Sequence, residues 1–267
     1  MPVLKVLFIG DVVGKGGRKA VKALVPELKR KYGCSFTIVN AENSASGAGI
    51  SSSCLEEMEG VDVFTGGDHT WDQKKFEEEI LHFKNFLRPA NLSELQPGIG
   101  WSKFRNPVCG EVAVVSLIGK VFMKESAYCP FETIEKILPQ IPGTCKNIFV
   151  DFHAEATSEK LAMGYFLDGK VTAVIGTHTH VQTSDAQILP GGTALLTDVG
   201  MVGGARSVLG REVDDVVRKF RTGMPTKLNV VERDIRLDAC VVAYDTSTGK
   251  AVSIETISQK YTEGQEN

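Results

Sequence analysis

The sequence lacks the signatures of several common protein classes. No run of about 18 apolar residues occurs, so a membrane-spanning helix is not expected. The first residues, MPVLKVLFIGD, are apolar only as far as Asp11, which argues against a usual signal peptide. None of the six cysteines forms a Cys-x-x-Cys pair, and their irregular spacing favours small buried side chains with reduced thiols. We therefore expect a cytoplasmic protein.

An excess of positive charge is also missing. Lysine and arginine number 30 against 33 aspartates and glutamates, which gives a net charge of −3. Without a basic stripe, a long DNA or RNA molecule is not expected as the main partner. A compact anionic ligand remains compatible with this composition, because a local site can be positive inside a mildly acidic protein.

Two familiar enzyme motifs are absent as well. The glycine-rich segment GDVVGKGGRK has no following Gly-Lys-Ser/Thr, so it is not a Walker A phosphate loop. We interpret its glycines as permitting a tight turn and a close backbone approach over a metal-binding edge. No Gly-x-Ser-x-Gly segment occurs, which argues against a serine hydrolase of that type.

What the sequence does contain is an alternation of short apolar runs with amphipathic segments. We expect strands at residues 5–10, 36–41, 61–67, 111–119, 147–154, 171–178, 193–200, 228–234, 237–245 and 250–258. We expect helices at residues 17–33, 54–60, 74–83, 131–140, 158–167 and 211–223. This order predicts an α/β fold with parallel strands. The chain is 42% hydrophobic, which favours a single domain over residues 1–267 with two packed sheets and a β-rich carboxyl-terminal part.

Four of the five histidines lie at the ends of expected strands. They are His69, His153, His178 and His180, whereas His82 lies within an expected helix. Other strand ends carry Asp11, Glu42, Asn43 and Asp68. Because the carboxyl ends of parallel strands meet at one edge of a sheet, we expect these side chains to lie close together.

Such a cluster indicates a metal site. Three carboxylates and four imidazoles at one edge would be poorly solvated without a cation, and mixed nitrogen and oxygen ligands favour Mn, Fe, Zn or Co over Mg or Ca. Each residue taken alone has a simpler interpretation, since Asp11 could cap the next helix and a strand-end histidine is commonly solvated. Their joint occurrence favours the metal site.

The order of these residues resembles that of the calcineurin-like metallophosphoesterases and, more closely, the YmdB-like branch of bacterial phosphodiesterases. The segments that carry the resemblance are FIGDVVG, NAENSASGAGI, GGDHTWD, RPAN, DFHAEATSEK, GTHTHVQT and TDVGM. The resemblance implies a metallophosphoesterase-like α/β/β/α sandwich, in which two packed β-sheets are flanked by helices. It also implies two divalent or mixed-valence transition metal ions, Fe or Mn, and the hydrolysis of 2′,3′-cyclic nucleotides.

The resemblance further implies a role for each residue of the cluster. One metal would be held by Asp11, Glu42, Asn43 and His180, and the other by Glu42, Asp68, His153 and His178. Glu42 would bridge the two ions, and His69 matches the proton donor of the family. One departure stands out, because the branch usually reads GNHTWD where this sequence has GDHTWD. Asp68 therefore replaces a neutral asparagine ligand.

We predict from these features a phosphodiesterase that hydrolyses a small cyclic nucleotide through a metal-activated hydroxide, with His69 as proton donor. Two alternatives stay open: a regulatory RNA- or protein-binding protein with a structural metal site, and a metal-dependent hydrolase of a non-phosphate substrate. Four residues could form a substrate rim or stabilise loops, namely Arg88, Asn91, Ser158 and Arg206. The sequence leaves open whether the chain forms a homo-oligomer.

Overall fold

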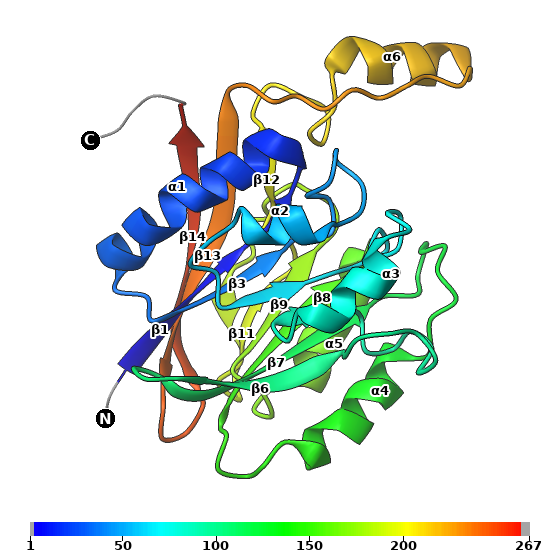
Figure 1. Cartoon of the computed structure of the whole chain (residues 1–267). Helices are drawn as coiled ribbons and strands as arrows, with labels where there is room; N and C mark the ends of the chain where they lie inside the picture. The colour runs from blue at the N-terminus through cyan, green and yellow to red at the C-terminus, as the bar shows by residue number, and fades with distance from the viewer. Residues whose placement is uncertain (1–2, 263–267) are drawn as a thin grey trace.

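Two β-sheets pack face to face and helices cover their outer faces, as the computed structural model of residues 3–262 shows (Figure 1). This is the expected sandwich of two packed sheets flanked by helices. Residues 1–2 and 263–267 of the predicted domain lie outside the described residues.

The first sheet has eight strands in the order β2-β12-β13-β1-β3-β4-β5, with β14 paired to β13. Its strands are β1 (Val3–Ile9), β2 (Asp11–Val12), β3 (Phe36–Asn40), β4 (Val63–Thr65), β5 (Phe86–Leu87), β12 (Met201–Gly204), β13 (Ile235–Asp245) and β14 (Ala251–Tyr261). Strands β1, β3, β4 and β5 are parallel, so their carboxyl ends lie at the same edge.

The second sheet has six strands in the order β10-β11-β9-β8-β7-β6. They are β6 (Trp101–Asn106), β7 (Gly110–Ile118), β8 (Asn147–His153), β9 (Ala173–Thr177), β10 (Gln187–Ile188) and β11 (Ala194–Leu196). The inner strands β7, β8, β9 and β11 are parallel, whereas β6 and β10 pair antiparallel at the two edges.

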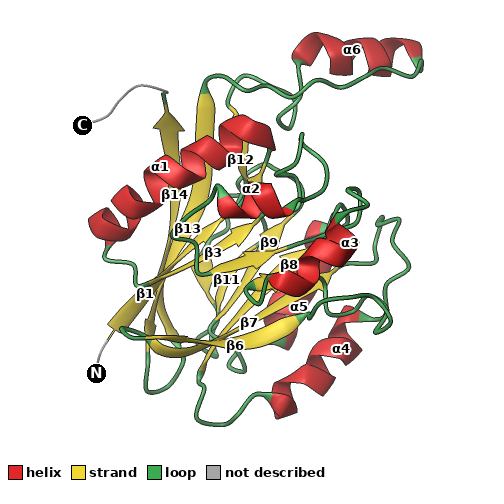
Figure 2. Ribbon diagram, viewed as in Figure 1, coloured by secondary structure: helices red, strands yellow, loops and turns green. Residues whose placement is uncertain are grey.

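Helices lie on both outer faces of the sandwich (Figure 2). The first sheet is covered by α1 (Gly14–Tyr32), α2 (Ser52–Glu56) and α3 (Phe76–Glu79), and the second by α4 (Pro130–Ile137) and α5 (Thr157–Phe166). Two short 3₁₀ turns follow α3 and α4, at Ile80–His82 and Leu138–Gln140. The last helix, α6 (Val213–Thr222), projects away from the sandwich in both views.

Alternation along β1 explains how one strand serves two apolar layers. Leu7 and Ile9 face the helices, whereas Val6 and Phe8 face the second sheet, because successive side chains of a strand point to opposite faces. All four are fully buried. Burial of each such side chain contributes about 1.5–3 kcal/mol, so this strand anchors both layers.

Two expectations about individual strands were wrong. Residues 228–234 form no strand beyond a single bridge between Val230 and Arg211, because Glu232 instead accepts backbone hydrogen bonds at the start of α1. The expected strand 193–200 ends at Leu196, and β12 follows as a separate strand. The expected close approach of a glycine is found beside the predicted ligand Asp11, because a Cβ on Gly10 would lie 2.0 Å from the carbonyl oxygen of Gly200.

Two expectations about composition can be compared with the structure. All six cysteines are free thiols, and five of them are buried, which agrees with their interpretation as small core side chains. Across residues 3–262, no helix combines the length and the apolar character needed to cross a bilayer.

Candidate metal centre

Side chains from both sheets converge at one edge of the sandwich, where the predicted residues are found. Asp11 begins β2, Glu42 and Asn43 follow β3, and Asp68 follows β4. From the second sheet, His153 ends β8, and His178 and His180 follow β9. Packing of the two sheets therefore places carboxylates of one sheet opposite imidazoles of the other.

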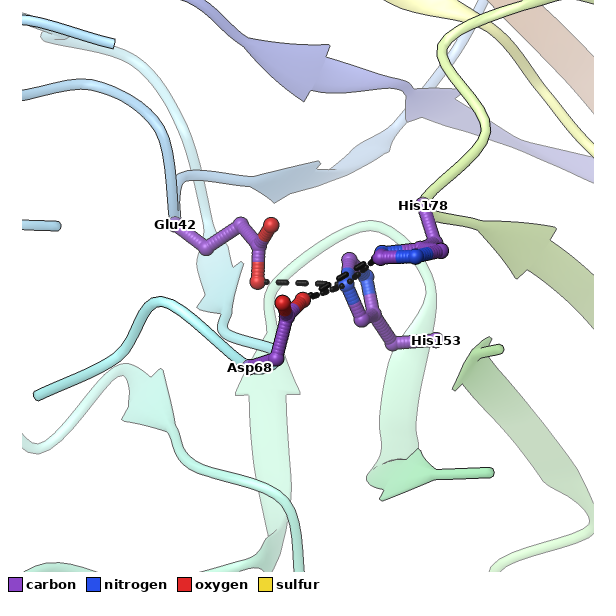
Figure 3. A group of neighbouring side chains, drawn as sticks. All are labelled: Glu42, Asp68, His153 and His178. Atoms are coloured by element: carbon purple, nitrogen blue, oxygen red, sulfur yellow. Dashed lines mark hydrogen bonds and ion pairs between the residues drawn. The ribbon is translucent and has the colours of Figure 1, made fainter. Parts of the chain in front are cut away.

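Four of these side chains point toward one another, as Figure 3 shows for Glu42, Asp68, His153 and His178. The Nε2 atom of His153 lies 2.8 Å from Oδ1 of Asp68, 3.0 Å from Nδ1 of His178 and 3.2 Å from Oε2 of Glu42. One donor atom from each residue lies within 4.8 Å of the other three. This spacing and this mixture of nitrogen and oxygen suit a transition metal ion.

The tautomer of His153 supports that interpretation. Thr177 donates its hydroxyl hydrogen to Asp151 at 2.7 Å, so its oxygen accepts the Nδ1 hydrogen of His153 at 2.9 Å. Burial, offset in part by Asp68, lowers the pKa of His153 to about 4, so the ring is neutral at neutral pH. Its Nε2 lone pair then faces the carboxylate of Asp68, which is repulsive unless a cation lies between them.

A second group lies beside the first. Oδ1 of Asp11 is 3.9 Å from Nε2 of His180 and 3.7 Å from Nδ1 of His153. The amide of Asn43 donates to Oε1 of Glu42 at 2.8 Å and lies 3.2 Å from Nε2 of His180. Oδ1 of Asp11 is fully buried without a hydrogen-bond partner, and such an oxygen is normally satisfied or bound to a cation.

Electrostatics at the edge favour a cation. Burial raises the pKa of Asp11 well above its ordinary value, and the neighbouring carboxylate of Asp198 raises it further. Burial likewise raises the pKa of Glu42, and Asp68 and Asp11 add to that effect. Bound positive charge would remove both penalties. The donor set therefore fits the transition metals that the sequence indicated.

His69 lies at the mouth of the cluster rather than inside it. Its side chain is 39% exposed, and its Nδ1 is 2.7 Å from Oδ2 of Asp72. The other nitrogen, Nε2, is 3.6 Å from Oδ2 of Asp68. The backbone nitrogen of His69 donates to Oε2 of Glu42 at 3.3 Å, which ties this loop to the carboxylates. The ring is thus oriented by one carboxylate while its second nitrogen is directed to the cluster.

Comparison with known proteins agrees with this geometry. The family model of YmdB-like proteins matches residues 7–257 of this chain. This chain belongs to the YmdB-like family. It is 43% identical to a 2′,3′-cyclic-nucleotide 2′-phosphodiesterase of Bacillus subtilis over 256 residues, which are 95% of this chain and 96% of the relative. The resemblance seen in the motifs is therefore confirmed.

Solved structures give the same result for the fold of this YmdB-like chain. The crystal structure of a novel phosphatase from Mycoplasma pneumoniae is 34% identical with a TM-score of 0.91, and the match covers 99% of this chain and 96% of that one. The calcineurin-like phosphoesterase YfkN from Bacillus subtilis is 12% identical with a TM-score of 0.57, covering 97% and 90%. The likeness to YfkN shows that the two proteins share a fold.

A strained loop carries two of the histidines. The backbone φ angles of His178 and His180 are positive, at 102° and 62°, and residues other than glycine rarely adopt such angles. Asp198 fixes this loop, because it accepts a hydrogen bond from the backbone nitrogen of Thr179 at 3.0 Å. Its charge is matched by Lys160 of α5, whose Nζ lies 2.8 Å away in the interior. A buried ion pair thus holds the backbone between the two histidines.

The four candidate rim residues do not line the cavity at the cluster. Arg88 is buried and donates to three backbone carbonyls, and Asn91 is buried between two segments of backbone. Arg206 lines a different cavity, and Ser158 is exposed on α5. The interpretation as loop-stabilising residues is therefore supported for Arg88 and Asn91.

The cavity at the cluster contains residues that the sequence did not single out. It has a volume of about 420 Å³, and Glu42, His69 and His178 lie at one end of it. The same cavity is also lined by α6 and the segments before and after it, including Arg211 and Phe220. Sequence reasoning treated residues 211–223 only as a helix, and its four basic and three acidic side chains gave no sign that it lies beside the metal cluster.

Proposed function

We propose that this chain is a metal-dependent phosphodiesterase that hydrolyses small cyclic nucleotides, with 2′,3′-cyclic nucleotides as its substrates. The observation that carries the proposal is the convergence of His153 Nε2 with Asp68, Glu42 and His178 at the shared edge of two sheets. Its support from comparison is the Bacillus subtilis relative that is named for this reaction.

The ligand assignment from the sequence is retained as part of this proposal. Glu42, Asp68, His153 and His178 would hold one ion, and Asp11, Asn43, His180 and again Glu42 would hold the other. The bridging role of Glu42 is supported by its position, because Oε2 faces His153 while Oε1 faces Asn43. Iron and manganese are the proposed metals. When bound, the two ions would supply a water of lowered pKa and positive charge for the phosphate oxygens.

The proton donor in this proposal is His69. Hydrolysis joins the oxygen of water to phosphorus and breaks a bond from phosphorus to a ribose oxygen, which must then take up a proton. The Nδ1 side of His69 is held by Asp72 at 2.7 Å, and this contact orients the ring. Nε2 can then deliver its proton to the departing oxygen, because it lies on the cavity side next to Asp68.

Metal analysis together with substrate assays tests the function. We expect purified protein to contain iron or manganese and to hydrolyse 2′,3′-cyclic nucleotides faster than amide and carboxylic ester substrates. The Glu42→Gln variant should lose bound metal and turnover together. A preference for amides or esters would overturn the reaction class, and normal metal content in the Glu42→Gln protein would overturn the bridging role.

A further inference from the structure

Helix α6 presents an aromatic side chain that has no packing role in the sandwich. Val216 is the one buried residue of the helix, whereas Phe220 is 79% exposed. In Figure 1 the helix lies clear of both sheets. Val216, Lys219 and Phe220 share one face, because residues three and four apart on a helix are neighbours.

That face forms one wall of the cavity at the candidate metal centre. Val216, Lys219 and Phe220 line it together with Glu42 and His178. The segments before and after the helix contribute Leu209 and Leu228 to the same cavity. The cavity is therefore lined both by the charged, candidate metal-ligating groups and by a largely apolar wall with an aromatic ring.

Arg211 gives this wall a positive charge. Its guanidinium group donates to the carbonyl oxygens of Leu228 at 3.0 Å and Ser46 at 3.3 Å, and also to that of Gly47. Within residues 3–262, no carboxylate lies at ion-pair distance from Arg211. The carbonyls fix the position of the group but leave its charge unbalanced, which favours an anionic ligand in the cavity.

We propose that the wall formed by α6 binds the nucleobase of the substrate, with the ring of Phe220 stacked on the base while the phosphate lies at the ligand cluster. This inference rests on the proposed function and names the part of the cyclic nucleotide that α6 recognises. Every base offers a π face, so stacking does not distinguish strongly among bases. The wall therefore selects nucleotides over small phosphodiesters that lack a base.

Two substrates and three variants test this assignment, with Mn²⁺ in excess. The substrates are 2′,3′-cyclic AMP and glycerol 1,2-cyclic phosphate, which has the cyclic diester but no base. Phe220→Ala should lower the ratio of kcat/KM for the nucleotide to that for the glycerol diester about 5- to 100-fold, mainly through KM. Phe220→Trp should restore the ratio. Val217→Ala, on the same helix but outside the cavity lining, should leave it unchanged.

Equilibrium binding gives a second measurement that does not depend on turnover. By calorimetry, Phe220→Ala should weaken the binding of adenosine 3′-phosphate by a similar factor and leave the binding of inorganic phosphate within about twofold. Light scattering on the same samples reports the molecular mass. An equal loss on both substrates together with a change in mass would assign Phe220 to a contact between subunits and overturn the proposal.

The remaining outcomes separate this inference from the proposed function. Wild-type turnover of 2′,3′-cyclic AMP with an unchanged ratio in Phe220→Ala overturns the role of α6 alone. Absence of wild-type turnover on both cyclic diesters overturns the proposed function and this inference with it.

Discussion

Asp68 is the residue at which the resemblance to YmdB-like proteins leads us to expect asparagine instead. Its Oδ1 atom faces His153 at 2.8 Å and His178 at 3.2 Å, so it lies among the candidate ligands rather than turned away from them. Compared with asparagine, it adds one negative charge at the cluster. A charge about 4 Å away is worth up to about 4 kcal/mol at an effective dielectric constant of 20.

This charge leads to a prediction for Asp68→Asn. The variant should bind metal less tightly, raise kcat/KM for a cyclic nucleotide several-fold at neutral pH, and shift the pH optimum downward. The physical reason is that less negative charge leaves a stronger attraction for phosphate and a more acidic bound water. The pH profile must be measured with metal in excess. A profile that is unchanged, or lower at every pH, would show that the charge of Asp68 does not limit the reaction.

His69 and Asp72 are expected to act as a pair. His69→Ala should lower turnover of a cyclic nucleotide about 10²- to 10⁴-fold at unchanged metal content, because it would remove the proposed general acid. Asp72→Asn should lower turnover less, by about tenfold, since the His69 ring remains but loses the carboxylate 2.7 Å from its Nδ1. The double variant should be no slower than His69→Ala, because the two residues act as a unit.

An aryl phosphodiester serves as the control for this pair. Its leaving group needs little protonation, so both variants should lose less activity on it than on the cyclic nucleotide. Additive losses in the double variant, or equal losses on both substrates, would contradict the proton-donor role.

At the scale of elements, Asp198 joins helix α5 to the loop after β9, because it pairs with Lys160 and accepts a hydrogen bond from Thr179. Lys160 is 2% exposed and Asp198 is 1% exposed, so their ion pair is shielded from water. Gly176 must lack a side chain here, because a Cβ would lie 1.9 Å from the carbonyl oxygen of Thr197. Helix, loop and strand are thus in close contact immediately beside His178.

Removal of one partner of this pair should be strongly destabilising. Lys160→Met leaves the Asp198 carboxylate buried without its cation, at a cost of about 3–5 kcal/mol. At about 2–4 °C per kcal/mol for a chain of this size, the midpoint of thermal unfolding should fall by about 6–20 °C. The double variant Lys160→Met with Asp198→Asn should recover much of this loss. Equal midpoints for the single and double variants would show that the unpaired charge is not the cause.

For the whole molecule, the two sheets depend on one another at the edge that they share. Carboxylates of the first sheet meet imidazoles of the second, and no covalent link within residues 3–262 joins the two sheets there, because the cysteines are free. A cation bound between them would therefore stabilise the packing of the sheets as well as supply chemistry.

Metal removal is expected to lower the stability of the whole chain. A ligand that binds the folded state at about 100 times its Kd contributes about 2.7 kcal/mol, which corresponds to about 5–10 °C in Tm for this size. Dialysis against a chelator should produce this decrease, and added Mn²⁺ should reverse it. Glu42→Gln is the matched control and should respond less to both treatments. A wild-type Tm that is indifferent to chelator would rule out a metal that supports the fold.

The sequence by itself determined the order of the main strands and helices and the position of the candidate site. Strand and helix periodicity is local, so the alternation of apolar residues in β1 or β8 can be read without knowledge of their partners. Residues such as His153 and His178 were recognisable because each lies at the end of such a run. Conversely, β12 was missed, because its two glycines give no β signal, and residues 228–234 were assigned to a strand for their apolar residues alone.

Only the tertiary structure decided which of these groups meet. Sequence spacing does not show that Asp72 orients His69, that Thr177 sets the tautomer of His153, or that Lys160 neutralises Asp198. The last two contacts join different elements, and the first depends on how a loop turns back on itself. The approach of α6 to the cluster is also a matter of tertiary structure, because the spacing of Val213, Val216, Val217 and Phe220 indicates an apolar helix face but not the surface that this face meets. Contacts of this kind arise from the conformation of loops and from the packing of elements that are distant in the sequence, which local periodicity does not encode.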